Sequence, residues 1–156
     1  MIEKIIPLKI ISEANKSEHW SKKSARHRKQ KHMISLFLKP VISTISLPCH
    51  VELTRIAPRM LDEHDNLRSS LKWAVDAIAG LLLPNLEPGR ADDDKRISWA
   101  YSQERRGIRE YGLKVVIIED QEIEMMESDS KYLRSFAEST KKMLDVNVPK
   151  ESDEKN

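Results

Sequence analysis

The chain has 156 residues, one cysteine, 33% charged residues and 39% hydrophobic residues, as expected for one ordinary domain with a modest core. Its longest apolar run, residues 77–83, is far shorter than the roughly 20 residues that cross a bilayer. Cys49 has no second cysteine with which to form an internal disulfide or a cysteine-based zinc site. No secretory signal pattern opens the chain, so we expect a cytoplasmic protein without a membrane span.

The charge is unevenly distributed along the chain. Residues 1–118 hold 21 bases and 14 acids, a net charge of +7, whereas residues 119–156 hold 6 bases and 11 acids, a net charge of −5. A basic body favours an anionic partner such as nucleic acid. The acidic tail is either solvated or occupies the basic surface when no ligand is present. We expect a folded domain over 1–120 and an acidic tail over 121–156, with a short helix near 129–144.

The N-terminal third predicts a strand and then a strongly basic helix. Residues 4–12 are β-branched and partly alternating, which indicates an opening strand that Pro7 places near an edge. Residues 15–31 carry seven bases against one acid. Helix formers continue without glycine or proline up to Pro40, and the second half has an apolar face, so we expect a helix over 21–38. Its polar first half either projects or lies on a charged ligand.

The remaining elements predict an α+β fold. Residues 49–57 favour a strand, and apolar residues at three- and four-residue steps predict a helix over 65–83 with Asp65 as its N-cap. Two further alternating segments, 97–101 and 113–117, predict strands joined by a hairpin over 103–110. The order β-α-β-α-β-β, with an added C-terminal helix, predicts an α+β domain with a small mixed β-sheet and two main helices.

Two carboxylate-rich loops flank the second predicted helix. Hard divalent cations prefer such oxygen ligands, and loops at the ends of elements hold side chains on a rigid scaffold. If the two loops meet, they form a Mg²⁺ site, with Mn²⁺ as a substitute, beside a lysine of the helix. Such a site suits phosphodiester hydrolysis, because the metal activates water and the lysine stabilises the departing oxyanion. The candidate metal ligands are Asp62, Asp65, Asp76, Asp92, Asp93 and Asp94, and the candidate catalytic residues are Asp65, Lys72, Asp92 and Asp94.

Each of these residues also has a structural interpretation. Asp65 as a helix cap contributes roughly 0.5–2 kcal/mol without any metal. The triplet at 92–94 is typical of a solvated turn, and Lys72 lies one helical turn from Asp76, where the two charges pair. If the triplet is extended, alternation sends Asp92 and Asp94 to one face and Asp93 to the other.

The combination resembles the RusA family of phage and prophage Holliday-junction resolvases. The resemblance rests on LDEHDNL, LKWAVDAIAG and GRADDDKRISW, and on the basic segment NKSEHWSKKSARHRKQKHMI, and it covers about residues 5–118. The best-known family pattern is D-x-D-N-x-x-K. Here His64 stands two places before Asn66, and Lys72 follows six places after it, so either Asp62 or His64 replaces the first aspartate of the pattern.

The resemblance implies a small homodimer in the bacterial host cytoplasm, encoded by a phage or prophage. It implies a Mg²⁺-dependent endodeoxyribonuclease that resolves Holliday junctions or related branched DNA by paired nicks. The basic segment fits this function independently, because it neutralises several phosphates. Trp20 either stacks on a base or packs beside the helix start. The candidate DNA-binding residues are Lys16, Trp20, Lys22, Lys23, Arg26, Arg28, Lys29 and Lys31.

Two other functions compete with the nuclease. A non-catalytic nucleic-acid-binding phage protein would use the basic segment and leave the carboxylates as caps and turns. A phage structural or partner-binding domain would use the acidic tail but leave the basic segment without a role.

Overall fold

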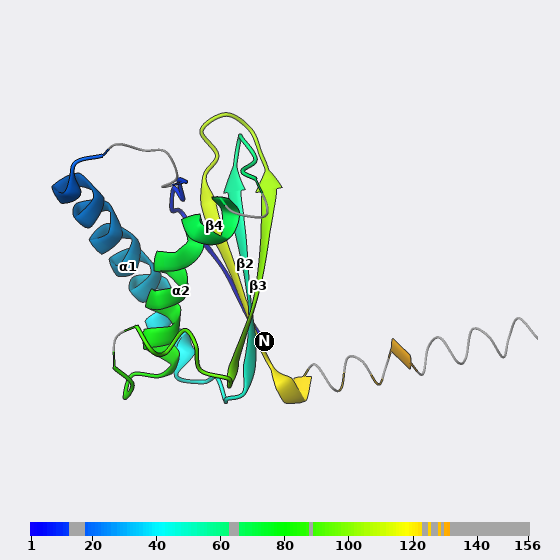
Figure 1. Cartoon of the computed structure of the whole chain (residues 1–156). Coiled ribbons are helices and arrows are strands. Elements are labelled where there is room, and N and C mark those ends of the chain that lie inside the picture. The colour runs from blue at the N-terminus through cyan, green and yellow to red at the C-terminus, as the bar shows by residue number, and fades with distance from the viewer. Residues whose placement is uncertain are drawn as a thin grey trace, which may run out of the picture. The chain divides into compact units, whose positions relative to one another are not determined.

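The computed structural model describes residues 1–12, 18–62, 66–87 and 89–122, together with residues 125, 128, 130 and 131. The chain divides into two units, residues 1–120 and 121–156. The first unit has the predicted α+β class, with a mixed sheet and two main helices (Figure 1). Its elements are β1 (Ile2–Ile6), α1 (Trp20–Ile42), β2 (Cys49–Ala57), α2 (Arg68–Leu82), β3 (Ile97–Arg105) and β4 (Gly112–Glu119).

The four strands lie in the order β1-β4-β2-β3. β2 and β3 are parallel, because α2 forms a crossover between them, and β4 is antiparallel to both β1 and β2. The predicted hairpin over 103–110 is therefore wrong, since β2 separates β3 from β4. The short connection passes the end of β2, where the backbone N–H of Arg106 donates to the carbonyl of Ala57 at 3.2 Å. Two strand spacings are about 10 Å, a gap that six residues bridge easily.

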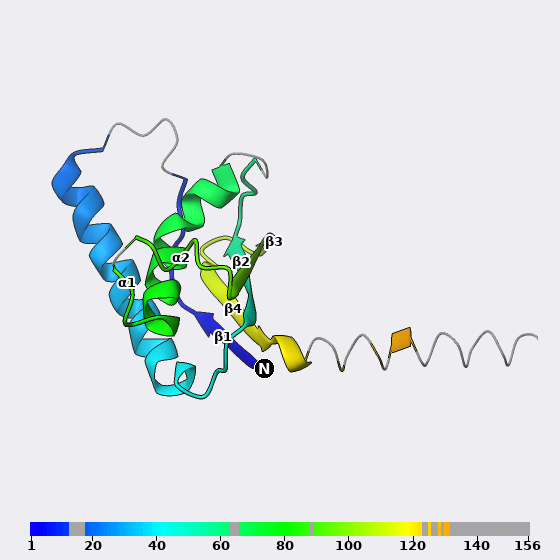
Figure 2. The same cartoon turned by 60° about the horizontal axis from the view of Figure 1, so that its bottom comes forward.

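Both helices pack on one face of the sheet (Figures 1 and 2). Along residues 49–54 of β2, inward-facing apolar residues alternate with polar residues that face the other side of the sheet, where Thr54 hydrogen-bonds Ser102 at 2.8 Å. This alternation places the core between the helices and the sheet. Fully buried core side chains come from both layers and include Ile34, Leu38, Val51, Leu53, Leu71, Ile78, Leu113, Val115 and Ile117.

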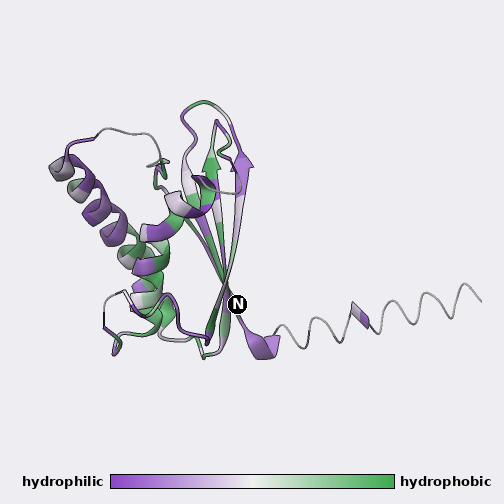
Figure 3. Ribbon diagram, viewed as in Figure 1, coloured by the Kyte–Doolittle hydropathy of each residue, from purple (hydrophilic) through white to green (hydrophobic). Residues whose placement is uncertain are grey.

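α1 is longer than the predicted 21–38, because it continues through Pro40 to Ile42. Proline removes the hydrogen bond to the carbonyl four residues earlier, which here belongs to Leu36. Leu36 is 60% exposed and Pro40 is also exposed, so the proline lies on the solvent side of the helix. Figure 3 shows the contrast within α1, whose N-terminal part is hydrophilic and whose C-terminal part is more apolar.

Two boundaries near the chain's loops differ from the predictions. The opening strand ends at Ile6 instead of residue 12, because Pro7 cannot donate to the ladder, and β1 is an edge strand as predicted. α2 begins at Arg68, and Leu67, at its N-cap, makes no side-chain capping hydrogen bond. Asp65, the predicted cap, lies outside the described residues, as does the tail helix near 129–144 apart from residues 130 and 131. None of the helices in the described part of the chain combines the length and hydropathy that a bilayer crossing requires.

Candidate active site

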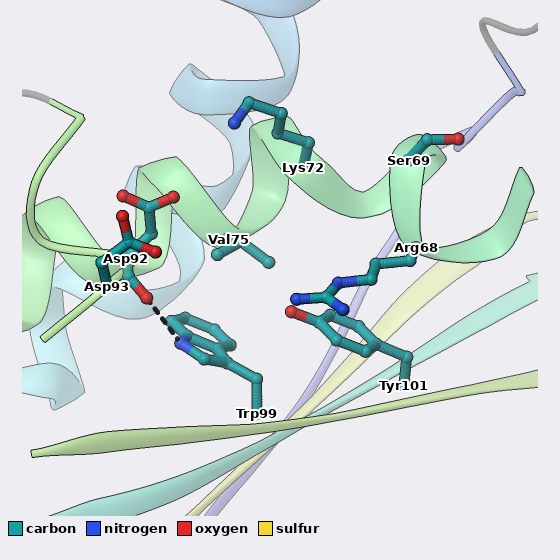
Figure 4. A pocket seen from close by; sticks show the side chains of 8 residues that line it. All are labelled: Arg68, Ser69, Lys72, Val75, Asp92, Asp93, Trp99 and Tyr101. Atoms are coloured by element: carbon teal, nitrogen blue, oxygen red, sulfur yellow. Dashed lines mark hydrogen bonds between the residues drawn. The ribbon is translucent and has the colours of Figure 1, made fainter. Parts of the chain in front are cut away.

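A cavity of about 540 Å³ lies between α2 and β3 (Figure 4). Odd-numbered residues of β3 face the helices, which puts the rings of Trp99 and Tyr101 under the cavity. Lys72 extends over it from α2, with Asp92 and Asp93 towards one end and the guanidinium of Arg68 towards the other. The cavity thus gathers two carboxylates and two cations above an aromatic floor, a mixture that suits an anionic substrate held with a cation.

Asp92 has an unusual environment for a carboxylate. Its backbone carbonyl accepts a hydrogen bond from Trp99 Nε1 at 3.3 Å, which ties the loop to β3. Its Oδ1 atom is buried and has no hydrogen-bond partner among the described residues. A buried acceptor without a partner is costly and rare. A bound cation would satisfy this oxygen.

Asp76 lies beside Asp92. Both line an adjoining cavity of about 390 Å³ together with Lys31 of α1. Burial raises the pKa of Asp76 above its ordinary value, and the negative charge of Asp92 raises it further, while Lys72 and Lys31 act in the opposite direction. Four predicted site residues, two carboxylates and two lysines, are therefore within electrostatic reach of one another.

The three aspartates at 92–94 do not point in the directions that an extended chain would give them. These residues lie in turns, so strand alternation does not apply, and Asp92 and Asp93 line the cavity instead of Asp92 and Asp94. Asp94 turns back on Arg96, with its carboxylate oxygens accepting from the Arg96 backbone N–H and the guanidinium, each at 2.9 Å. These hydrogen bonds lower the pKa of Asp94 to about 2. Its carboxylate is thus engaged within the turn.

The donor set fits a magnesium ion. No group of three His, Cys, Asp or Glu side chains in the described ranges is placed to hold a metal. Mg²⁺ commonly takes only one or two carboxylates and completes its shell with waters and substrate phosphates. Asp76 and Asp92 would meet that requirement, and the Oδ1 atom of Asp92, which has no hydrogen-bond partner among the described residues, could ligate such an ion. Asp62 is exposed in the loop before α2, and Asp65 lies outside the described residues.

The candidate DNA-binding residues divide between two sides of α1. Trp20, Lys23, Arg28 and Lys31 line a groove of about 360 Å³ towards α2. Trp20 is 75% exposed there, so it does not pack against the body. Lys22 is exposed, whereas Arg26 pairs with Glu18 and, with Lys29, lines the other side of the helix. Lys16 lies outside the described residues.

The sequence did not predict five of the side chains at this surface. His27 stacks on Trp73 of α2 with ring centroids 3.8 Å apart, which joins the two helices beside the groove. Trp99 and Tyr101 were predicted as strand residues without a functional role, although their alternation placed them on one face. Arg68 lies one helical turn before Lys72, so the two side chains share one face of α2. That spacing could have predicted from the sequence that Arg68 lines the same cavity.

The comparisons with known proteins add no identification. No family model matches the chain, and no curated protein matches it. The functional proposal therefore depends on the geometry and on the sequence resemblance.

Proposed function

We propose that the chain is a Mg²⁺-dependent, structure-selective endodeoxyribonuclease that acts as a homodimer and cuts Holliday junctions or related branched DNA by paired nicks. The observation that carries the proposal is the continuity of three adjoining surfaces. Lys31 lines both the basic groove beside α1 and the cavity that contains Asp76 and Asp92. Asp92 also lines the cavity that contains Lys72. A phosphate backbone bound along α1 would thus lead directly to the paired carboxylates.

The charged side chains of the two adjoining cavities have distinct tasks in this proposal. Asp92 and Asp76 would hold the metal ion, with Asp93 beside them. Such an ion, when bound, supplies a Lewis acid and a water of lowered pKa. Lys72 neutralises negative charge that develops on the phosphate and the departing oxygen. Arg68, towards the other end, is placed to bind a neighbouring phosphate through its planar guanidinium.

The aromatic floor supports the same chemistry. Trp99 fixes the position of Asp92 through its hydrogen bond to the backbone carbonyl. Arg68 lies over Tyr101, with 5.8 Å between the guanidinium carbon and the ring centroid. The two rings therefore hold the acidic loop and the basic side chain on opposite sides of the space where a phosphodiester would lie.

The proposal is tested by incubating the protein with a labelled four-way junction and a matched linear duplex, in Mg²⁺, in Mn²⁺ and in EDTA. We expect metal-dependent paired nicks near the branch and an intact duplex. Asp92→Asn should abolish cleavage while preserving junction binding, and Asp120→Asn, which lines neither cavity, should cut like the wild type. Equal cleavage of junction and duplex would contradict structure selectivity. Sedimentation of the protein alone and with junction tests the homodimer.

A second candidate is a non-catalytic nucleic-acid-binding phage protein. The exposed Trp20 beside Lys23 and Arg28 favours it, because the groove that these side chains line contains no carboxylate from the part of the chain that the structure describes. Stacking on an aromatic ring contributes roughly 1–3 kcal/mol per base. This function predicts salt-sensitive DNA binding that is indifferent to Mg²⁺, with no cleavage product under any metal condition.

A further inference from the structure

A separate pocket of about 590 Å³ lies where the segment after β1, the end of β2 and the β3–β4 connection come together. Three of its lining residues carry positive charge, Lys9, Arg55 and Arg59, and Tyr111 adds a phenol ring. Among the described residues, no carboxylate side chain lines it. It shares no lining residue with the three surfaces of the candidate active site.

Arg55 is the unusual member of this group, because it is only 5% exposed. Its Nε donates to the carbonyl of Ile10 at 3.1 Å, and its Nη1 donates to the carbonyl of Arg59 at 2.8 Å. No Asp or Glu in the described part of the chain forms an ion pair with it. Burial lowers the pKa of Arg55 below its ordinary value, so the fold holds this charge against a desolvation cost. Buried charges are normally paired.

The guanidinium also has donors left over. Arginine carries five N–H groups in a planar fork, and the two carbonyls engage only part of that number. The ammonium of Lys9 lies 4.4 Å from the centroid of the Tyr111 ring at the same pocket. Arg59 is joined to Arg55 through its own carbonyl. Three cations from two segments of the chain thus surround one hollow, and no Asp or Glu among the described residues pairs with the most buried of them.

We propose that this pocket binds a phosphate group. A tetrahedral oxyanion accepts hydrogen bonds from a guanidinium fork, and its charge would balance the cations around the pocket. The group is either a backbone phosphodiester of nucleic acid or free inorganic phosphate. The pocket lies apart from the cavity proposed for cleavage, and no bond is broken in it. Phosphate binding at this pocket can therefore be tested without assuming that the chain is a nuclease.

The first arm of the test uses inorganic phosphate, titrated into the full-length protein by calorimetry at constant ionic strength maintained with NaCl. Lys9→Met and Arg59→Met should each weaken phosphate binding by about tenfold, since each removes a charge-assisted contact. Lys39→Met and Arg90→Met are matched controls, because both residues are exposed cations that do not line the pocket. Arg55 stays in place, because its hydrogen bonds hold two chain segments together.

The second arm identifies the source of the phosphate through DNA binding measured over a range of salt concentrations. If the pocket holds a backbone phosphate, each pocket variant should make the negative slope of log K against log salt shallower by about 1. If the pocket holds only free phosphate, the slope stays at the wild-type value while phosphate binding weakens. The proposal is overturned if the pocket variants match the wild type in both arms, or if the control variants change either measurement as much as they do.

Discussion

The cavity at Asp92 and the pocket at Arg55 differ in a way that bears on what each binds. The first contains a buried carboxylate oxygen without a hydrogen-bond partner among the described residues. The second contains a buried guanidinium that donates to two backbone carbonyls but has no carboxylate partner among those residues. The first mixes carboxylates with Lys72 and Arg68, whereas the charged side chains that line the second are, among the described residues, all cations. A mixed site accommodates a metal ion and a phosphate together, and a purely cationic site accommodates an anion alone. Chemistry is therefore expected only at the first.

The two sites also arise from different kinds of backbone. Asp92 lies in a turn before β3, where the side-chain direction depends on local hydrogen bonds. Arg55 lies on β2, paired with both β3 and β4, so the sheet fixes its position. We expect substitutions at Asp92 to affect activity more than stability, and substitutions at Arg55 to do the reverse.

After the loss of cleavage expected for Asp92→Asn, the largest expected effect is the slower cleavage by Lys72→Ala. Removal of a group that stabilises transition-state charge typically lowers the rate by a factor of about 10²–10³. Lys72 lowers the pKa of Asp76 more than Lys31 does, so it acts strongly on the proposed metal site. Single-turnover cleavage of a four-way junction measures this loss. Lys39→Ala removes an exposed lysine from α1 and should leave the rate unchanged. An unchanged rate in Lys72→Ala would exclude this lysine from the mechanism.

Arg55→Met is expected to destabilise the fold. The variant leaves the carbonyls of Ile10 and Arg59 without their donor, and we expect the free energy of unfolding to fall by roughly 3 kcal/mol. Urea denaturation measures this change. Phosphate should stabilise the wild type but not the variant, because a ligand stabilises only a protein that binds it. Equal stability of the two proteins would show that Arg55 does not hold these segments together.

Asp76→Asn should change how stability depends on pH. The pKa of Asp76 is raised above its ordinary value of 3.8 in the folded state, so the folded protein binds this proton more tightly than the unfolded chain does. The stability from the bound proton is fully present below pH 3.8 and is lost as pH rises through the raised pKa. The wild type should therefore lose stability relative to Asp76→Asn as pH rises from 3.8 through the raised pKa of Asp76.

Melting temperatures across this pH range, recorded in EDTA, give the size of the effect. Adding Mg²⁺ at neutral pH should stabilise the wild type and reduce the difference in melting temperature between it and Asp76→Asn. The reason is that the bound ion neutralises the negative charge of the carboxylate. A difference that is independent of pH would mean that the charge of Asp76 has no energetic role.

Asp94→Asn is expected to have the smallest effect on cleavage, within about twofold of the wild-type rate, since a surface ion pair contributes little. The low pKa of Asp94, about 2, comes from its hydrogen bonds to Arg96. The stabilisation it provides is therefore present above the ordinary carboxyl pKa and disappears as pH falls through about 2. Melting temperatures at neutral and acid pH check this direction. If Asp94→Asn lost as much cleavage activity as Asp92→Asn, Asp94 would have to be a catalytic or metal-binding residue after all.

The sequence predicted most of the elements but not how the last strands pair. Alternation of Val51 and Leu53 with polar neighbours gave the bounds of β2 correctly. The hairpin prediction was wrong because Gly107 offered a local turn, whereas pairing is decided by burial over the whole sheet. The apolar run 115–118 indicates a central strand, and a central β4 between β1 and β2 is what the structure contains.

The candidate site was predictable in composition and less so in detail. Spacing along a helix correctly placed Lys72 and Asp76 together. Three consecutive aspartates carry no internal signal that distinguishes them, and it is Arg96, two residues later, that removes Asp94 from the cavity. The arginine pocket escaped prediction, because Lys9, Arg55 and Tyr111 are far apart in sequence and meet only through the sheet. The catalytic and metal-binding roles themselves stay predictions.

The position of β4 has a consequence for the order in which the chain folds. Two of the three strand pairings in the sheet involve β4, which is the last strand of its unit. During synthesis, β1 therefore emerges more than a hundred residues before the strand that binds it, and β2 is paired on one side only. Such long-range pairing is slow and leaves edges exposed to aggregation. We expect a chain cut before Gly112 to leave β1 without a partner, so the sheet is completed in one late step after synthesis of the whole unit.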